Sequence, residues 1–368
     1  MAYSIEAGCQ GLPRLPFPDI GCNSDATYLY HDRGLDQKRI PYVQEFNEYP
    51  PLTATLQYLE SLPVHSSQGF FLLNTLVMAI LALAMTWVVY VALDGSPRTW
   101  IWALGPPLWL YAAHNWDLLP VLLATAGLWM HSRKREGWAG ALLGLAVAAK
   151  WYPALFGLVV FTDLLRSERR FGPRTRLFAL AATAGALLPH LPYLFVAPRG
   201  VIEAYAFHLG RTPTEESLVF VLERISEAPS WVANLLGAAG VLAVVVVAIR
   251  RVWSGAIGFL PAALAVLAAA MMGNKVYSLQ YAIWLLPLLA LVRLPWPPLA
   301  LFFAADLVVH HYLYEHFHAP TDAAFLAWTA AFAVARAVGL GWMVACALRP
   351  SDRTRPGASP SGAGTPSG

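Results

Sequence analysis

Carboxylates and cations that could act on an anionic substrate gather in a few polar stretches of an otherwise apolar sequence. The first 68 residues carry eight carboxylates, and residues 197–229 carry five more. His208 and Arg211 lie in the second stretch, and Lys150 and Lys275 stand in two short breaks. A carboxylate can accept a proton, and a cation can stabilise growing negative charge. If these stretches meet at one membrane face, they suit a reaction on an anionic, lipid-linked substrate.

The composition indicates that a bilayer solvates much of this chain. Apolar residues make up 57% of the 368 residues and charged residues 13%, against roughly 45–50% and about 25% in soluble domains. The 14 Trp and 15 Tyr fit a protein with two lipid–water boundaries. The net charge of +3, without a basic run among polar residues, argues against a nucleic-acid partner.

Three zones follow from this pattern: a polar region over 1–68, an apolar zone over 69–348 with a polar loop at 197–229, and a Pro/Ser/Gly tail over 349–368 that we expect to be disordered. Only helices leave no backbone group open to lipid in such a zone. The sequence therefore predicts an all-α polytopic membrane protein, a bundle of about 11 transmembrane or re-entrant helices. The expected helices are Gly69–Leu93, Thr99–Ala113, Trp116–Met130, Trp138–Ala149, Trp151–Leu165, Leu177–Val196, Trp231–Ile249, Gly255–Met271, Ser278–Val292, Pro297–Leu313 and Ala323–Leu348. Several are shorter than the roughly 20 residues of a full span, so they are either misbounded or buried in the bundle.

The distribution of Lys and Arg predicts the orientation. If residues 1–68 lie outside and the helices alternate, the inside loops and the tail hold 15 of the 25 Lys and Arg residues, and the longer outside segments hold nine. The positive-inside rule then places the polar region on the extracytoplasmic face of a cell membrane, and the residue usage suggests a bacterial one. No signal peptide precedes this region, so we expect a further helix upstream of Met1 in the native chain.

The three cysteines show no metal-ligand spacing. Cys9 and Cys22 lie in the polar region, and an oxidising compartment would allow a disulfide between them. Two free thiols are the alternative.

Four segments, in this order along the chain, resemble the GT-C membrane glycosyltransferases. The similarity is greatest to the family 87 type, the polyprenol-phosphate-mannose-dependent mannosyltransferases. The segments are Cys22-Asn-Ser-Asp25-Ala-Thr-Tyr-Leu-Tyr-His-Asp-Arg33 with the later Ile-Pro-Tyr42 and Glu48-Tyr-Pro-Pro-Leu, then Asn115-Trp-Asp-Leu-Leu-Pro, then Gly140-Ala-Leu-Leu-Gly-Leu-Ala-Val-Ala-Ala-Lys150-Trp-Tyr-Pro, and finally Asn274-Lys275-Val-Tyr-Ser-Leu-Gln280-Tyr281-Ala-Ile-Trp284. Leu279 stands where that family usually has proline.

The resemblance implies that extracytoplasmic loops form the active site and that Asp25 is the general base. A carboxylate there could take the proton of an acceptor hydroxyl as it attacks the anomeric carbon, with inversion. The donor phosphate would need cations, and the candidates are Lys150, Lys275, Arg211 and His208. The remaining candidates for substrate binding are Arg33, Tyr42, Glu48, Tyr49, Asn115, Gln280, Tyr281 and Trp284.

Each of these residues also has a simpler interpretation. Asp25 could be one solvated loop acid among several, and Lys150 or Lys275 could snorkel from a helix end. Arg211 could cap the loop or pair with Glu215. Asp117 is best explained as a helix N-terminal residue, favoured by the helix dipole. The spacing of the histidines His310, His311, His316 and His318 fits no strong metal motif. Asp306 and Arg336 lie inside two consecutive expected helices and suggest a structural ion pair.

The leading function is therefore transfer of a hexose, with mannose favoured by the resemblance, from a polyprenyl-phosphate donor to a lipid or glycan acceptor. A polyprenyl-lipid or small-molecule transporter or flippase is the alternative, which Asp306 and Arg336 favour, and a structural subunit without activity is a third. Transporters tend to place ionisable groups near the bilayer midplane on two related halves, whereas most acids here lie in outer segments. The sequence contains no glycine-rich phosphate loop and predicts no cofactor, and the histidine spacing predicts no metal. The sugar, the acceptor and the oligomeric state stay open.

Overall fold

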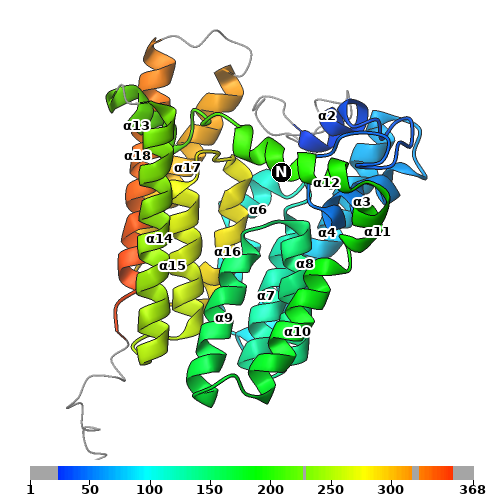
Figure 1. The fold of residues 1–368 in the computed structure, drawn as a ribbon. Coiled ribbons are helices and arrows are strands. Elements are labelled where there is room, and N and C mark those ends of the chain that lie inside the picture. The colour runs from blue at the N-terminus through cyan, green and yellow to red at the C-terminus, as the bar shows by residue number, and fades with distance from the viewer. Residues whose placement is uncertain (1–23, 227–228, 317–322, 351–368) are drawn as a thin grey trace, which may run out of the picture.

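In a computed structural model, residues 24–226, 229–316 and 323–350 are described. These residues form helices joined by turns, and the parts described contain no β-strand beyond one isolated bridge between Pro41 and Glu45. Helices α2 (Asp25–Asp32), α3 (Pro51–Ser61), α12 (Pro198–Gly210) and α13 (Leu218–Ser226) lie at one end of the molecule, at the top of Figure 1. The longer helices run away from that end.

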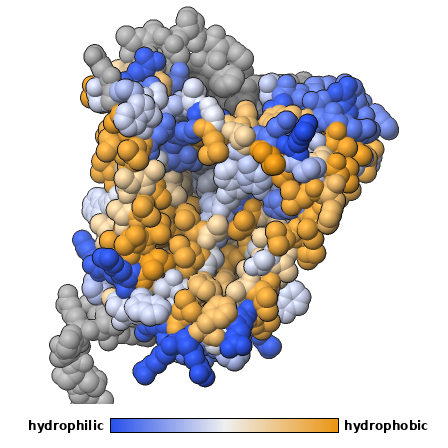
Figure 2. Space-filling model, viewed as in Figure 1, coloured by the Kyte–Doolittle hydropathy of each residue, from blue (hydrophilic) through white to orange (hydrophobic). Residues whose placement is uncertain are grey.

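Three helices are long and apolar enough to cross a membrane, judged by length and composition over the described residues. They are α4 (Ser67–Ala92), α14 (Ser230–Ser254) and the part of α18 (Ala323–Ala347) that begins at Ala327. Figure 2 shows apolar side chains over the middle of the molecule and polar ones towards both ends, as a protein surrounded by lipid requires. The membrane character is therefore supported, whereas the predicted count of eleven spanning helices is not confirmed.

One group of helices packs through very small residues. It contains α7 (Leu118–Ser132), α8 (Glu136–Ala149), α9 (Pro153–Glu168) and α10 (Pro173–Leu187), which lie together on one side of Figure 1. A Cβ added at Gly144 of α8 would lie 2.2 Å from the Ala182 oxygen of α10, so only glycine permits this approach. The close packing of α8 on α10 fixes the position of Lys150, which follows α8 directly.

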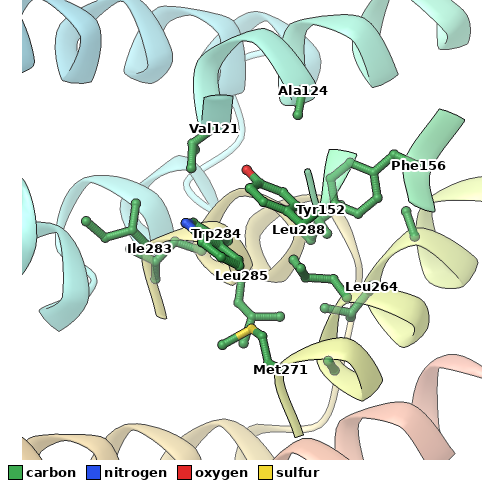
Figure 3. Close-up of a cluster of buried hydrophobic side chains, with 14 of the residues drawn as sticks. Val121, Ala124, Tyr152, Phe156, Leu264, Met271, Ile283, Trp284, Leu285 and Leu288 are labelled. Atoms are coloured by element: carbon green, nitrogen blue, oxygen red, sulfur yellow. The ribbon is translucent and has the colours of Figure 1, made fainter. Parts of the chain in front are cut away.

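The second group includes two helices that are almost fully buried, α15 (Phe259–Gly273) and α16 (Ala282–Leu291). It also contains α14, α17 (Trp296–His316) and α18, and α16 lies at its edge towards α7. Helices α15 and α16 are apolar on all sides because they face protein on all sides. Figure 3 shows Trp284 of α16 beside Tyr152, with Phe156 on the other side of Tyr152, so aromatic side chains join the two groups. The Tyr152 and Trp284 rings are stacked, with centroids 4.3 Å apart.

Two expected helices are interrupted in the structure. The segment predicted as 99–113 forms α5 (Thr99–Ala103) and α6 (Pro106–Tyr111), and the segment predicted as 177–196 forms α10 and α11 (Leu191–Val196). Proline explains both breaks, because its nitrogen cannot donate a helical hydrogen bond, and Gly105, which precedes Pro106, has an extended backbone. Pro106 begins α6, and Pro189 and Pro192 flank the start of α11. A third expected helix, 278–292, begins with the 3-10 turn η2 (Leu279–Tyr281).

The polar segments 1–68 and 197–229 contain helices where the sequence suggested loops. Helix α12 packs so closely on the segment after α2 that a Cβ at Gly200 would lie 2.3 Å from the Tyr42 oxygen. Tyr42 has a left-handed backbone conformation, with φ 65°, at this contact. The division into a catalytic region, a bundle and a cytoplasmic tail stays a prediction, and residues 351–368 lie outside the part described.

Candidate active site

Asp25 is the first residue of α2. Its Oδ2 accepts from the Tyr49 hydroxyl and from the Asn115 amide, both at 3.4 Å. His114 Nε2 lies 3.7 Å from Oδ1, and the Asp25 side chain keeps 34% of its surface exposed. The carboxylate is thus held by three neighbours and still open to a substrate hydroxyl.

Lys150 lies between α8 and α9 and forms an ion pair with Asp117. The Lys150 Nζ is 2.5 Å from Asp117 Oδ1, and Trp284 Nε1 donates to Oδ2 over 3.0 Å. The ammonium also faces the rings of Tyr49, Tyr281 and Trp284, 5.2–5.4 Å from their centroids. Burial alone would lower the pKa of Lys150, but the Asp117 carboxylate and then Tyr281 raise it above its usual value. Lys150 is therefore a charged group with its own counter-ion.

Asp117 is the residue that sequence reasoning assigned to a helix terminus only. It does occupy the N-cap position of α7, but its side chain makes no capping hydrogen bond, and only 1% of the residue is exposed. Its backbone N–H donates to Asn115 Oδ1 over 2.9 Å, which closes a tight turn. The Asn-x-Asp spacing signals such a turn, but no sequence signal links Asp117 to Lys150.

Tyr49 connects Asp25 with the Lys150–Asp117 ion pair. Its hydroxyl donates to Asp25 and its ring faces Lys150, while burial, followed by the nearby Asp25 charge, raises the pKa of this phenol well above its usual value. The phenol therefore stays protonated and can donate. Tyr42 donates its own hydroxyl to the Tyr49 carbonyl oxygen, and the Tyr49 N–H donates to Asn47 Oδ1 over 2.9 Å. Tyr42 thus supports Tyr49 from behind.

His208, on α12, lies beside the same site. Its Nε2–H donates to the Glu48 carbonyl over 2.8 Å, and its ring contacts Trp151, with centroids 5.0 Å apart. Burial lowers the pKa of His208, and the positive charges of Arg211 and Lys150 lower it further. The lowered pKa favours a neutral imidazole, rather than a cation, near these two positive groups.

Arg211 and Lys275 lie at the C-terminal end of α12. Arg211 is the C-cap residue and its guanidinium stands 5.7 Å from the Phe207 ring centroid, while Lys275 Nζ donates to the Leu209 carbonyl over 2.6 Å. Over the described ranges, no carboxylate lies within 4.0 Å of either cation, and Arg211 does not pair with Glu215. Within the ranges that the structure describes, neither side chain has a counter-ion.

Arg33 differs from these cations because carboxylates neutralise it. Its Nε donates to Glu48 Oε2 over 2.6 Å, and its Nη1 contacts Asp32. Arg33 also lies 5.2 Å from the Phe46 ring centroid. Glu48 thus joins Arg33 through its side chain and His208 through its backbone.

The other predicted residues are placed as follows. Gln280 lies in η2 with 7% of its surface exposed, beside Tyr281, whose ring stacks on Trp284 with centroids 3.9 Å apart. Cys9, Cys22 and His318 lie outside the described residues, as do the side chains of His311 and His316. Among the described residues, no three His, Cys, Asp or Glu side chains are grouped to hold a metal ion.

The predicted ion pair between Asp306 and Arg336 is confirmed. Arg336 Nη1 lies 3.4 Å from Asp306 Oδ1, and both side chains are 2% exposed. Arg336 also stands 3.6 Å from the Tyr277 ring centroid and donates to the Glu216 carbonyl. This cluster connects α17 and α18 to the segments that carry Lys275 and Arg211.

At one end of the helical bundle, the described residues thus combine a proton acceptor, Asp25, with an aromatic cage of three rings around Lys150. Arg211 and Lys275, which have no counter-ion among these residues, complete the arrangement. Residues 47–272, more than half of the chain, match the family model described as Glycosyltransferase family 87. The chain belongs to glycosyltransferase family 87. Its match to family 87 includes Tyr49, Asn115, Lys150 and Arg211, and it begins after Asp25. Among curated proteins, no sequence matches the chain significantly.

Proposed function

We propose that this family 87 enzyme transfers a hexose, with mannose as the favoured sugar, from a polyprenyl-phosphate donor to a lipid or glycan acceptor. The reaction takes place on the extracytoplasmic face and inverts the anomeric centre, with Asp25 as the general base. One observation carries the proposal: the open Asp25 carboxylate lies at the same end of the bundle as Arg211 and Lys275, which have no counter-ion among the described residues. Tyr49, Lys150 and His208 connect these groups.

The proton and electron pairs of the reaction balance with a single base. Asp25 takes the proton of the acceptor hydroxyl as its oxygen attacks the anomeric carbon, and the bond from that carbon to the phosphate oxygen breaks. The departing lipid phosphate keeps the electron pair. A phosphate is a good leaving group, so no second carboxylic acid is needed to protonate it, in contrast to glycoside hydrolysis.

The charges of the site favour Arg211 and Lys275 as the phosphate ligands. Lys150 is already balanced by Asp117 at 2.5 Å, so a phosphate gains less from it. Arg211 offers a planar fork that matches phosphate oxygens, and Lys275 adds a point charge. The caged Lys150, with Tyr281 and Trp284, then forms the wall against which the sugar lies. Since His208 is neutral, it serves as a spacer between the cations.

The proposal is tested by transfer from radiolabelled polyprenyl-phosphate mannose, with purified protein and an acceptor lipid extract. Asp25→Asn keeps the hydrogen-bonding shape but removes the base, and we expect a rate loss of about 10²- to 10⁴-fold. Asp36→Asn is the matched control, because Asp36 lies in the same polar segment and bonds His31, 3.1 Å away, rather than the site. Equal loss in both variants, or transfer unaffected by Asp25→Asn, contradicts the role of Asp25.

A polyprenyl-lipid or small-molecule flippase is the second candidate, and Asp306 and Arg336 inside the bundle are the observation that favours it. Their mutual pairing, with Tyr277 and the Glu216 carbonyl, gives them a structural explanation. Vesicles containing the protein distinguish the two functions. Lipid movement between leaflets without any sugar transfer supports the flippase.

A further inference from the structure

Glu60, on α3, is a buried acid that the proposed reaction does not use. Its Oε2 accepts from Trp116 Nε1 over 2.8 Å and from Asn74 Nδ2 over 3.2 Å, and the residue is 4% exposed. Its other oxygen, Oε1, is buried and has no hydrogen-bond partner in the part of the chain that the structure describes. A buried acid without a cation is costly, so it calls for an explanation.

Trp116, which Glu60 holds, stands between two residues of the site. Asn115 on one side donates to Asp25, and Asp117 on the other binds Lys150. The Trp116 side chain is completely buried, and its ring lies edge-on to Tyr49, with centroids 5.6 Å apart. Among the described residues, the two donors to the Asp25 carboxylate are therefore Asn115, next to Trp116 in sequence, and Tyr49, in ring contact with it.

We propose that Glu60 is a positioning residue of this enzyme, the acid that locks the Trp116 indole and thereby sets the spacing between Asp25 and the caged Lys150. This inference rests on the proposed function, because it assumes that this spacing governs the transfer rate. Glu60 touches neither the base nor the cations. It acts through the Asn115–Asp117 turn.

The surroundings of Glu60 favour its neutral form. Burial raises the pKa of Glu60 to about 7, against the two hydrogen bonds from Trp116 and Asn74, which lower it. Asn74 Oδ1 is likewise buried without a partner, so a proton on Glu60 Oε1 would give both orphaned oxygens a hydrogen bond. Lys38, on the segment after α2, donates to the carbonyls of Ser61 and Val64, which follow Glu60 in the chain. A carboxylic acid paired with an amide needs no counter-ion.

Glu60→Gln and Glu60→Leu separate positioning from simple space filling. The amide of Glu60→Gln keeps the acceptor for Trp116 and is uncharged, so we expect kcat within about threefold of wild type. Glu60→Leu fills similar space without an acceptor, and a small displacement of the turn should lower kcat about 10- to 100-fold. KM for the donor should change little, because Arg211 and Lys275 lie elsewhere. Ser61→Ala is the control, since the Ser61 hydroxyl bonds only the Tyr58 carbonyl of its own helix.

A readout without catalysis distinguishes this inference from the proposed function. In protein labelled with fluorotryptophan, the ¹⁹F resonance of Trp284 is assigned by its loss in Trp284→Phe. Trp284 does not bond Glu60, but it donates to Asp117, so Glu60→Leu should shift this resonance and Ser61→Ala should not. If wild type and Asp25→Asn transfer sugar equally, the proposed function fails while the resonance still tests Glu60.

Three results would overturn the inference. They are a wild-type kcat in Glu60→Leu, an unmoved Trp284 resonance in that variant, and a Glu60→Gln protein as impaired as Glu60→Leu. If Glu60→Leu does not fold, Trp116→Phe replaces it, because it keeps an aromatic ring and removes the N–H that Glu60 binds. We then expect a loss of kcat of about tenfold, and an unchanged kcat contradicts the proposal.

Discussion

Replacing Asp117 by asparagine tests how the charge of Lys150 is controlled. Asp117 holds Lys150 Nζ at 2.5 Å and the Trp284 indole at 3.0 Å, and it is nearly inaccessible to solvent. The amide keeps one oxygen as an acceptor but loses the negative charge. The nearest remaining carboxylate in electrostatic contact with Lys150 is that of Asp25. The unbalanced ammonium should therefore turn towards Asp25 and make it a weaker base.

The size of the effect follows from the burial of the pair. Breaking a fully buried ion pair costs about 3–5 kcal/mol. Lys150 keeps 18% of its side chain exposed, and the asparagine oxygen still accepts one hydrogen bond, so we expect about 2–3 kcal/mol. At about 1.4 kcal/mol for each factor of ten, kcat/KM should fall about 30- to 150-fold if this free energy is lost in the transition state.

The assay is the transfer rate of purified Asp117→Asn, normalised to the amount of monodisperse protein. Asp163→Asn is the matched control, because the Asp163 carboxylate also contacts a basic group. Its Oδ2 lies 3.2 Å from Nε2 of His131, which is in the last turn of α7, far from Asp117 at the start of that helix. The control should stay within a few-fold of wild type. A rate for Asp117→Asn within about threefold of wild type would refute the reasoning, because Lys150 would then need no counter-ion.

Three further predictions concern stability. Reversing either charge of the Asp306–Arg336 pair should lower the yield of folded protein, and the double swap should restore part of it, because Arg336 has other partners; a double variant no better than the singles contradicts the pairing. Gly200→Ala should lower the free energy of unfolding by about 1–3 kcal/mol, and with it the thermal midpoint, because its Cβ would lie 2.3 Å from the Tyr42 backbone oxygen. Gly210→Ala, which has open space around its Cβ, should leave the midpoint unchanged. Because the pKa of Glu60 is raised from 4.5 to about 7, the folded state binds this proton more tightly, so stability should fall by about 3 kcal/mol as pH rises through that window. The thermal midpoint of Glu60→Gln should lack this fall.

The long apolar runs were predictable because burial in lipid or protein demands them over many residues. The expected segments 69–93 and 231–249 correspond to α4 and α14, within a few residues at each end. Pro106 and Pro189 are visible in the sequence, but the apolar residues on both sides of each proline led to the prediction of a continuous helix. Helices α12 and α13 were missed because their polar residues resemble a loop when no packing partner is known.

The family and the relevant polar segments could also be inferred from sequence, but the pairings between them could not. Lys150 was predicted as a phosphate-binding cation, which stays a prediction, and the sequence did not reveal that it pairs with Asp117. That pairing joins residues 33 positions apart through the packing of α7 on α8, which no local pattern reveals. The lowered pKa of His208 likewise depends on its burial and on the nearby charges of Arg211 and Lys150, which together outweigh its bond to the Glu48 carbonyl.

A structure of Asp25→Asn with an intact polyprenyl-phosphate sugar bound would test the central claim most directly. The account predicts the phosphate against Arg211 and Lys275, the sugar beside Tyr281 and Trp284, and the anomeric carbon facing the side chain at position 25. A phosphate bound at the opposite end of the bundle, beside His131 and Asp163, would contradict it.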